Sequence, residues 1–93
     1  MTIGLVAVHY PDADHTDEMV HRVHAAADVL MATPGCLEAT CWRESNGAVV
    51  SIGNWESEDA LKAGFAAVAA AGVDFEYDER ESRPREVFRM VSA

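Results

Sequence analysis

A histidine and a tryptophan are the residues of this sequence with the clearest capacity for chemistry. His9 ends the apolar run "TIGLVAVH", and an imidazole titrates near neutral pH, so it can exchange a proton with a bound molecule. Residues 2–10 are apolar at odd and even positions, which predicts a strand covered on both faces. A buried polar side chain needs a partner, so a His9 within the covered part of the strand is a candidate for catalysis or ligand contact. If His9 lies past the covered part, it is simply a residue at the end of the strand.

Trp55 lies where a second apolar run, "AVVSIGNW", meets a predicted helix. Ser51 and Gly53 share its strand face because side chains alternate, and both are small. Small neighbours beside a large ring have two interpretations: the helix packs closely on the sheet, or a cavity of ligand size remains. In the second interpretation the residues that line the pocket are Trp55, His9, Tyr10, Ser51 and Phe65. His9 and Tyr10 compete for one position, because either face of the first strand can meet the helices.

Other chemistry is poorly represented. Cys36 and Cys41 are predicted to point to opposite faces of one strand, about 17 Å apart, which excludes a disulfide or a shared metal. His21 and His24 fall on an exposed helix face without a third metal ligand at suitable spacing. We see no glycine-rich phosphate loop and no Ser-His-Asp order, and nothing that would hold flavin or nicotinamide. The sequence therefore predicts no metal and no cofactor.

Composition limits the classes of partner. The 93 residues predict one domain, residues 1–93, with a formal charge of −9 that disfavours nucleic acid and anionic membrane surfaces. No apolar run approaches the roughly 20 residues that a bilayer span needs. The first apolar stretch has no basic residue before it, so we expect a cytoplasmic protein without a signal peptide. A small apolar or aromatic molecule suits this surface better.

Hydrophobic periodicity and turn signals divide the chain into six main elements. Strands are predicted at 2–10, 36–44, 48–55 and 86–92, and helices from about 16 to 32 and from 57 to 72, with Asp14 or Thr16 and then Ser57 as N-caps. The Asn-Gly pair within "SNG" (45–47) predicts a hairpin in which both residues tolerate positive φ. "VDFEY" (73–77) is interpreted as a short strand, and "DERESRPRE" (78–86) as a solvated connection whose arginines could alternatively form a lid or bridge to a second subunit.

The order of elements predicts an α+β fold of the ferredoxin-like type, βαββαβ, with both helices on one face of an antiparallel sheet. The chain supplies no cover for the other sheet face. A second copy packed sheet against sheet is the simplest cover, so we expect a homodimer.

Several local sequences also resemble a known family. "PGC" before the second strand, the hairpin, and "NWESEDAL" after the third strand are similar to the antibiotic biosynthesis monooxygenase-like family, whose members are dimeric α+β barrels. The resemblance implies this fold over nearly the whole chain. Its superfamily includes haem degraders, cofactor-free oxygenases, isomerases and stress proteins, so fold analogy does not select an activity.

Two branches of the family imply different residues. The haem-degrading branch pairs a tryptophan at the position of Trp55 with an asparagine on the first strand and a histidine on the second helix. Residues 3–10 contain no asparagine, and residues 57–71 contain no histidine. The branch that oxidises polyketide-like phenols with dioxygen pairs the tryptophan with an amide near the position of Ser51. Tyr77 and Arg89 are candidates for the tyrosine and arginine of that branch.

Together these observations predict a homodimer with a small apolar pocket between the sheet and the helices of each subunit. The predicted activity is cofactor-independent monooxygenation of a small aromatic or polyketide-like compound, in which His9 assists proton removal and Trp55 orients the ring. The alternative is a non-catalytic ligand-binding or stress-related dimer. Haem binding is disfavoured by the missing histidine.

Overall fold

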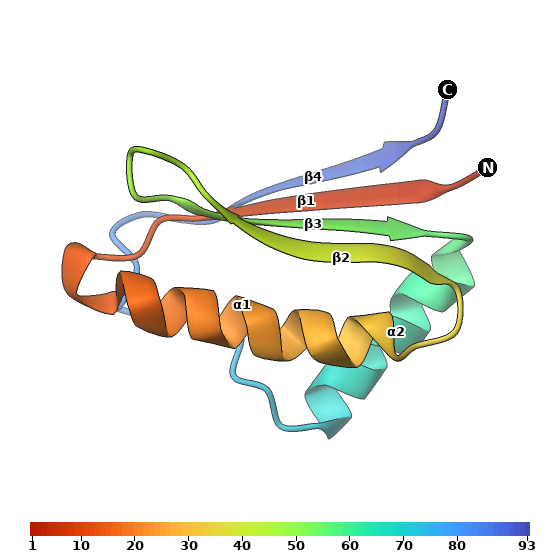
Figure 1. Ribbon diagram of the computed structural model, residues 1–93, viewed down its shortest axis with the longest axis horizontal. Helices are drawn as coiled ribbons and strands as arrows, with labels where there is room; N and C mark the ends of the chain where they lie inside the picture. Colours follow the sequence, from red (N-terminus) through yellow and green to blue (C-terminus); the bar gives the residue numbers. More distant parts are fainter.

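The computed structural model describes residues 1–93 and contains one four-stranded antiparallel sheet with two α-helices on one of its faces (Figure 1). The strands are β1 (Ile3–His9), β2 (Cys36–Arg43), β3 (Val49–Trp55) and β4 (Glu86–Val91), in the spatial order β2-β3-β1-β4. The helices are α1 (Thr16–Met31) and α2 (Glu58–Ala70), and a 3-10 turn, η1 (Ala13–His15), precedes α1. The predicted ferredoxin-like α+β fold is confirmed. No helix combines the length and the apolarity that crossing a bilayer requires.

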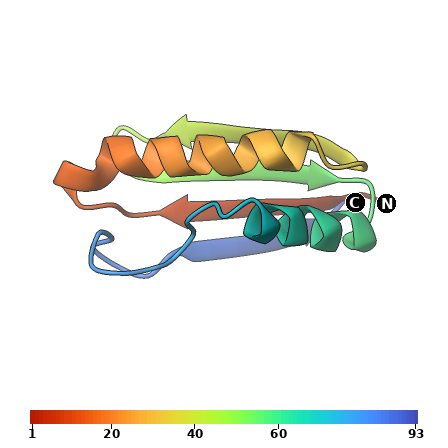
Figure 2. The same cartoon turned by 90° about the horizontal axis from the view of Figure 1, so that it is seen from below.

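The two helices cover different halves of the sheet. In Figure 2 α1 lies over β2 and β3, whereas α2 lies over β1 and β4. The register pairs Ile3 with Trp55 and His9 with Val49, and all four of these side chains are buried. The odd-numbered residues of β1 therefore face the helices, which places His9, and not Tyr10, on the covered side.

The helix starts follow local hydrogen bonding. Ser57 caps α2 as predicted, since its hydroxyl accepts a hydrogen bond from the backbone amide of Ala60 at 3.1 Å. The predicted cap of α1 was wrong: His15 occupies the N-cap position without a side-chain hydrogen bond, and Thr16 is the first helical residue. The turn η1 moves the start, because its backbone already curls before the helix begins.

The hairpin between β2 and β3 uses one residue with positive φ, not two. Gly47 has a φ of +94°, and no residue other than glycine has positive φ. The side chain of Asn46 instead accepts a hydrogen bond from the backbone amide of Ala48 at 2.9 Å. The loop is therefore a turn that closes on glycine in the left-handed region, a common three-residue connection.

A β-bulge near the start of β2 changes the orientation of its cysteines. The register shifts between Cys36 and Glu38, so that Cys36 pairs with Trp55 while Cys41 pairs with Ser51. Both sulfurs consequently lie on the helix side, which corrects the prediction of opposite faces. Both cysteines are free thiols.

The segment 71–85 differs most from prediction. Residues 73–77 form no strand, because their backbone carbonyls bond to arginine side chains: Arg22 reaches the carbonyls of Asp74 and Glu76, both at 2.9 Å. The charged run is also not simply solvated, because the Glu81 side chain is fully buried. Its arginines pair within their own chain, and Arg80 contacts Glu18, Asp74 and Asp78.

Helix α2 lies against the Trp55 ring through a glycine. A Cβ atom added to Gly64 would lie 2.2 Å from the Trp55 ring, so only glycine allows the ring to lie against the helix backbone. Trp55 is 1% exposed and packs with Ile3 and Leu61. Beyond this contact α2 runs away from the sheet (Figure 1).

Replacing Gly64 with alanine should lower the free energy of unfolding by about 1–3 kcal/mol, because the new methyl group overlaps the indole. At an exposed helix position the same change would raise stability by up to about 1 kcal/mol. Ala66→Gly, on the exposed side of α2, is the matched control and should cost about 1 kcal/mol through helix propensity alone. Chemical denaturation measures both, and a stabilised Gly64→Ala variant contradicts the contact.

Candidate functional site

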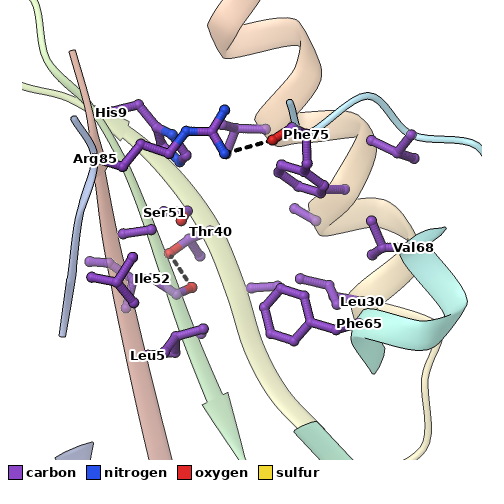
Figure 3. Close-up of a pocket in the computed structure, with 18 of the residues that line it drawn as sticks. Leu5, His9, Leu30, Thr40, Ser51, Ile52, Phe65, Val68, Phe75 and Arg85 are labelled. Atoms are coloured by element: carbon purple, nitrogen blue, oxygen red, sulfur yellow. Dashed lines mark hydrogen bonds between the residues drawn. The ribbon is translucent and has the colours of Figure 1, made fainter. Parts of the chain in front are cut away.

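A cavity of about 470 Å³ lies between the helices and the covered face of the sheet. Of the 20 residues that line it, 15 are hydrophobic. Its size and apolar lining fall within the range typical of small-molecule sites. The close-up in Figure 3 shows its wall of strands on one side and the helices on the other.

The cavity follows from two features of the sequence. Its floor contains small side chains on adjacent strands, since Ala7 of β1 pairs with Ser51 of β3, and Gly53 follows on the same face. Its roof is raised because α2 runs away from the sheet along its length (Figure 1). Small floor residues under a diverging helix leave volume that no side chain fills.

One end of the cavity is polar. His9 and Arg85 lie together there, near Phe75 (Figure 3). His9 is only 3% exposed, and its Nδ1 is the one buried side-chain nitrogen or oxygen without a hydrogen-bond partner. The nearest carboxylate oxygen, Glu81 Oε1, lies 3.7 Å from Nδ1, which is beyond hydrogen-bond distance.

Arg85 holds the buried Glu81 carboxylate in place. Its Nε donates to Glu81 Oε1 at 2.9 Å, and one terminal nitrogen donates to Oε2 at 2.8 Å. The same guanidinium donates to the backbone carbonyls of Phe75 at 2.7 Å and Glu76 at 2.9 Å. A rigid planar fork suits this set of acceptors, and the ion pair compensates a carboxylate that is removed from water.

The surroundings of His9 disfavour its charged form. Burial lowers its pKa below the usual range, and the positive charges of Arg85 and Arg22 lower it further, whereas Glu81 acts in the opposite direction. The imidazole is therefore neutral at pH 7 and carries one free lone pair. A neutral, unpartnered imidazole in an apolar cavity can accept a proton from a bound molecule.

The other end of the cavity is apolar and aromatic. Phe65 lies beside Leu30 and faces Leu5 of β1 across the cavity (Figure 3). Phe65 remains 42% exposed and Trp55 is buried against Gly64. Trp55 thus satisfies both interpretations drawn from the sequence, since it is a core residue and also lines the cavity.

Not all of the sequence-predicted residues meet at this site. His9, Ser51, Trp55 and Phe65 line the same cavity. Tyr10 points elsewhere: its hydroxyl donates to the carboxylate of Glu86, and the Arg83 guanidinium lies 3.7 Å from the centre of its ring. Tyr77 and Arg89 are also outside the cavity; Tyr77 is 51% exposed, and Arg89 pairs with Glu58 of α2 at 3.0 Å.

Sequence reasoning missed Arg85 and Glu81. Val87 of β4 lines the cavity, and side chains two residues apart on a strand lie on the same face. Extending β4 backward by one residue would therefore have predicted that Arg85 faces the cavity. No comparable signal marks Glu81, since it stands among other charged residues. No group of three or more His, Cys, Asp or Glu side chains is placed to hold a metal ion.

Comparisons with known proteins agree with this geometry. Residues 2–67 match the family described as antibiotic biosynthesis monooxygenase, and the chain belongs to that family. No curated protein sequence matches the chain.

Solved structures show the same fold at low sequence identity. Rv0793 from Mycobacterium tuberculosis has a TM-score of 0.79 at 18% identity, with 100% of this chain and 96% of that chain covered. PA3566 from Pseudomonas aeruginosa has a TM-score of 0.79 at 14% identity, covering 99% and 94%. SnoaB from Streptomyces nogalater, a cofactor-independent oxygenase solved as its N63A mutant, has a TM-score of 0.71 at 17% identity, covering 98% and 92%.

The lowered pKa of His9 should make stability depend on pH between about 7 and 5. In this window the unfolded histidine, with a pKa near 6.5, binds a proton that the folded one resists, so the free energy of unfolding falls as pH falls. The carboxyls of Asp74 and Asp78 also have lowered pKa values, but they change the free energy of unfolding only near and below the ordinary aspartate value of about 4.

Urea denaturation at one protein concentration across this pH range measures the slope. His9→Gln should flatten it, whereas His24→Gln, on the exposed face of α1, should leave it unchanged. An unaltered slope in His9→Gln contradicts the assignment.

Proposed function

We propose that the cavity binds a small planar phenol and that the protein oxygenates it with dioxygen and no cofactor. The observation that carries this proposal is a buried, neutral histidine at the polar end of an otherwise apolar cavity. Membership of the monooxygenase family and the fold shared with an oxygenase that needs no cofactor support the proposal.

The cavity suits a molecule with one polar end. From Leu5 to His9 the strand advances by roughly 13 Å, the length of two or three fused rings. The aromatic and aliphatic side chains of Phe65, Trp55 and Leu30 can contact the rings, while His9 and Arg85 are in position for one hydroxyl group. A ligand with charged groups at both ends would leave one of them buried without a partner.

The chemistry then requires only a base and a dry, shaped site. His9 takes the hydroxyl proton, and the phenolate gains carbanion character at the carbon opposite its oxygen. That carbon forms a bond with dioxygen, and the resulting peroxide takes the proton back from His9. Loss of water, with cleavage of the O–O bond and departure of the ring proton, leaves a quinone; one dioxygen is consumed and one water released. The protein contributes positioning, proton transfer and desolvation.

A second candidate is ligand binding without catalysis, and one observation favours it. No asparagine or glutamine side chain lines the cavity. Ser51 occupies the position where the phenol-oxidising branch has an amide, and Asn54 donates instead to Glu38 at 2.5 Å on the opposite face. Without an amide to hold the hydroxyl or the peroxide, the cavity would bind the phenol and leave it unchanged.

Oxygen uptake with 1-naphthol separates these functions. The proposal expects one dioxygen consumed for each 1,4-naphthoquinone formed. His9→Ala should lower kcat by roughly 10²–10⁴-fold, because a positioned general base contributes this much. His24→Ala is the matched control and should retain full activity. Quenching of tryptophan fluorescence by 1-naphthol without oxygen uptake would instead establish the binding function.

We also propose that two copies associate through the open face of the sheet, opposite the helices. Proteins of this family are typically dimeric. The even-numbered residues Val6 and Val8 of β1 lie on this face, beside Phe88 of β4. Trp42, Phe88 and Met90 are 57%, 48% and 47% exposed in the single chain. A large, contiguous apolar face is typical of an interface, and a two-fold pair would bury it on both copies.

Sedimentation velocity at micromolar concentration tests this association. The wild-type chain should sediment as a dimer, and Phe88→Glu should give a monomer, since it places a carboxylate within the apolar face of a chain that already carries a charge of −9. Met31→Glu, at an exposed position of α1, should remain dimeric. A monomeric wild-type protein contradicts the proposal.

A further inference from the structure

The carboxylate of Glu81 is buried next to the candidate base, His9. The Glu81 side chain is fully buried although it stands in a highly charged segment. Its ionic neighbours are Arg85, which binds both of its oxygens, and His9, whose Nδ1 lies 3.7 Å from Oε1. Burying a carboxylate beside a histidine is costly, so its position requires an explanation.

Backbone pairing places Glu81 next to the end of β1. Pro11 and Glu81 form an isolated antiparallel bridge. The amide of Asp12 donates to the carbonyl of Arg80 at 2.9 Å, and the amide of Ser82 donates to the carbonyl of Tyr10 at 2.7 Å. The residues that flank Glu81 are thus paired with those that follow His9, so the carboxylate is held beside the imidazole by the main chain.

The charges around His9 come from three directions. Glu81 faces Nδ1, Arg85 precedes β4, and Arg22 belongs to α1; the charges of both arginines act on the imidazole. Both carboxylate oxygens accept hydrogen bonds from Arg85, and a carboxylate has no hydrogen to donate to Nδ1. A lone pair on Nδ1 would face this negative charge, whereas an N–H there is attracted to it. The 3.7 Å between Nδ1 and Glu81 Oε1 is short enough for this electrostatic attraction to act in a buried site.

We infer that Glu81 is a positioning residue that holds His9 as the tautomer with hydrogen on Nδ1. This leaves the lone pair on Nε2 to accept a proton from the bound molecule. Arg85 fixes the position of the carboxylate, and Glu81 stabilises the imidazolium that forms when Nε2 is protonated. The tautomer is a property of the unliganded protein; its use in proton removal rests on the proposed function.

The alternative is that Glu81 serves only to anchor Arg85 and the segment 71–85. Glutamine distinguishes these roles because it has the shape of glutamate but carries a donor, NH₂, in place of one oxygen. The amide oxygen keeps the shorter contact with the terminal nitrogen of Arg85, which places the NH₂ group opposite Nδ1. A donor at this position favours the other tautomer, with hydrogen on Nε2. A merely structural role predicts no such exchange.

Long-range ¹H–¹⁵N correlation spectra of histidine-labelled protein at pH 7.5 report the tautomer directly. In the wild type His9 should show a protonated Nδ1 and an unprotonated Nε2, and Glu81→Gln should exchange the two. Glu79→Gln, an exposed position in the same segment, is the control and should leave the pattern unchanged. A wild-type His9 protonated at Nε2 overturns the inference, and this measurement does not depend on whether Glu81→Gln folds.

Oxygen uptake separates this inference from the proposed function. With 1-naphthol, Glu81→Gln should lower kcat by at least about 100-fold while the dissociation constant from fluorescence quenching changes less than about threefold. If the wild type consumes no oxygen but shows the Nδ1–H tautomer, the oxygenase proposal fails and the inference stands. If Glu81→Gln keeps both the tautomer and kcat, the carboxylate does not position His9.

Discussion

The contact between the Trp55 ring and Gly64 is the constraint on which the rest of the structure depends. It brings the middle of α2 against the Trp55 ring of β3, closer than any residue with a Cβ would allow. The helix direction then carries its C-terminal half away from the sheet, over β1 and β4 (Figures 1 and 2). One close approach therefore creates both the packed core around Ile3 and Leu61 and the empty volume beside it. Tight packing and a cavity, which look like alternatives in the sequence, are adjacent parts of one arrangement.

The polar end of the cavity depends on arginine side chains that bond to the irregular segment 73–77. Residues 73–77 have no strand partner, so their carbonyls need other donors, and the side chains of Arg22 and Arg85 supply them. Arg85 shares its guanidinium between these carbonyls and Glu81. The irregular segment and the carboxylate beside His9 are consequently held by the same side chain. A lysine, with a compact charge and no planar fork, would not reach all of these acceptors at once.

The sequence predicted the elements and much of the cavity, because hydrophobic periodicity and turn residues act locally. The parity of β1 remained open until its partners were known, since both faces of the strand are apolar and only tertiary contacts distinguish them. The bulge at Cys36 and Glu38 was missed because a one-residue register shift leaves no compositional trace. Glu81 was missed for a related reason: its burial comes from a pairing with Pro11 that is distant in the chain. Gly64 resembled an ordinary weak position in an alanine-rich helix.

Alternation along β1 separates the two proposed functions of the sheet. Leu5, Ala7 and His9 line the cavity, whereas Val6 and Val8 lie on the open face. Because neighbouring residues point to opposite faces, a substitution at an odd-numbered position of β1 can change ligand preference without changing the proposed association of subunits. The same alternation makes the strand intolerant of a register slip, since a shift of one residue would move His9 to the open face and a valine into its place. The backbone pairing of residues 10–12 with residues 80–82 opposes such a slip, and it thereby protects both the base and the carboxylate that faces it.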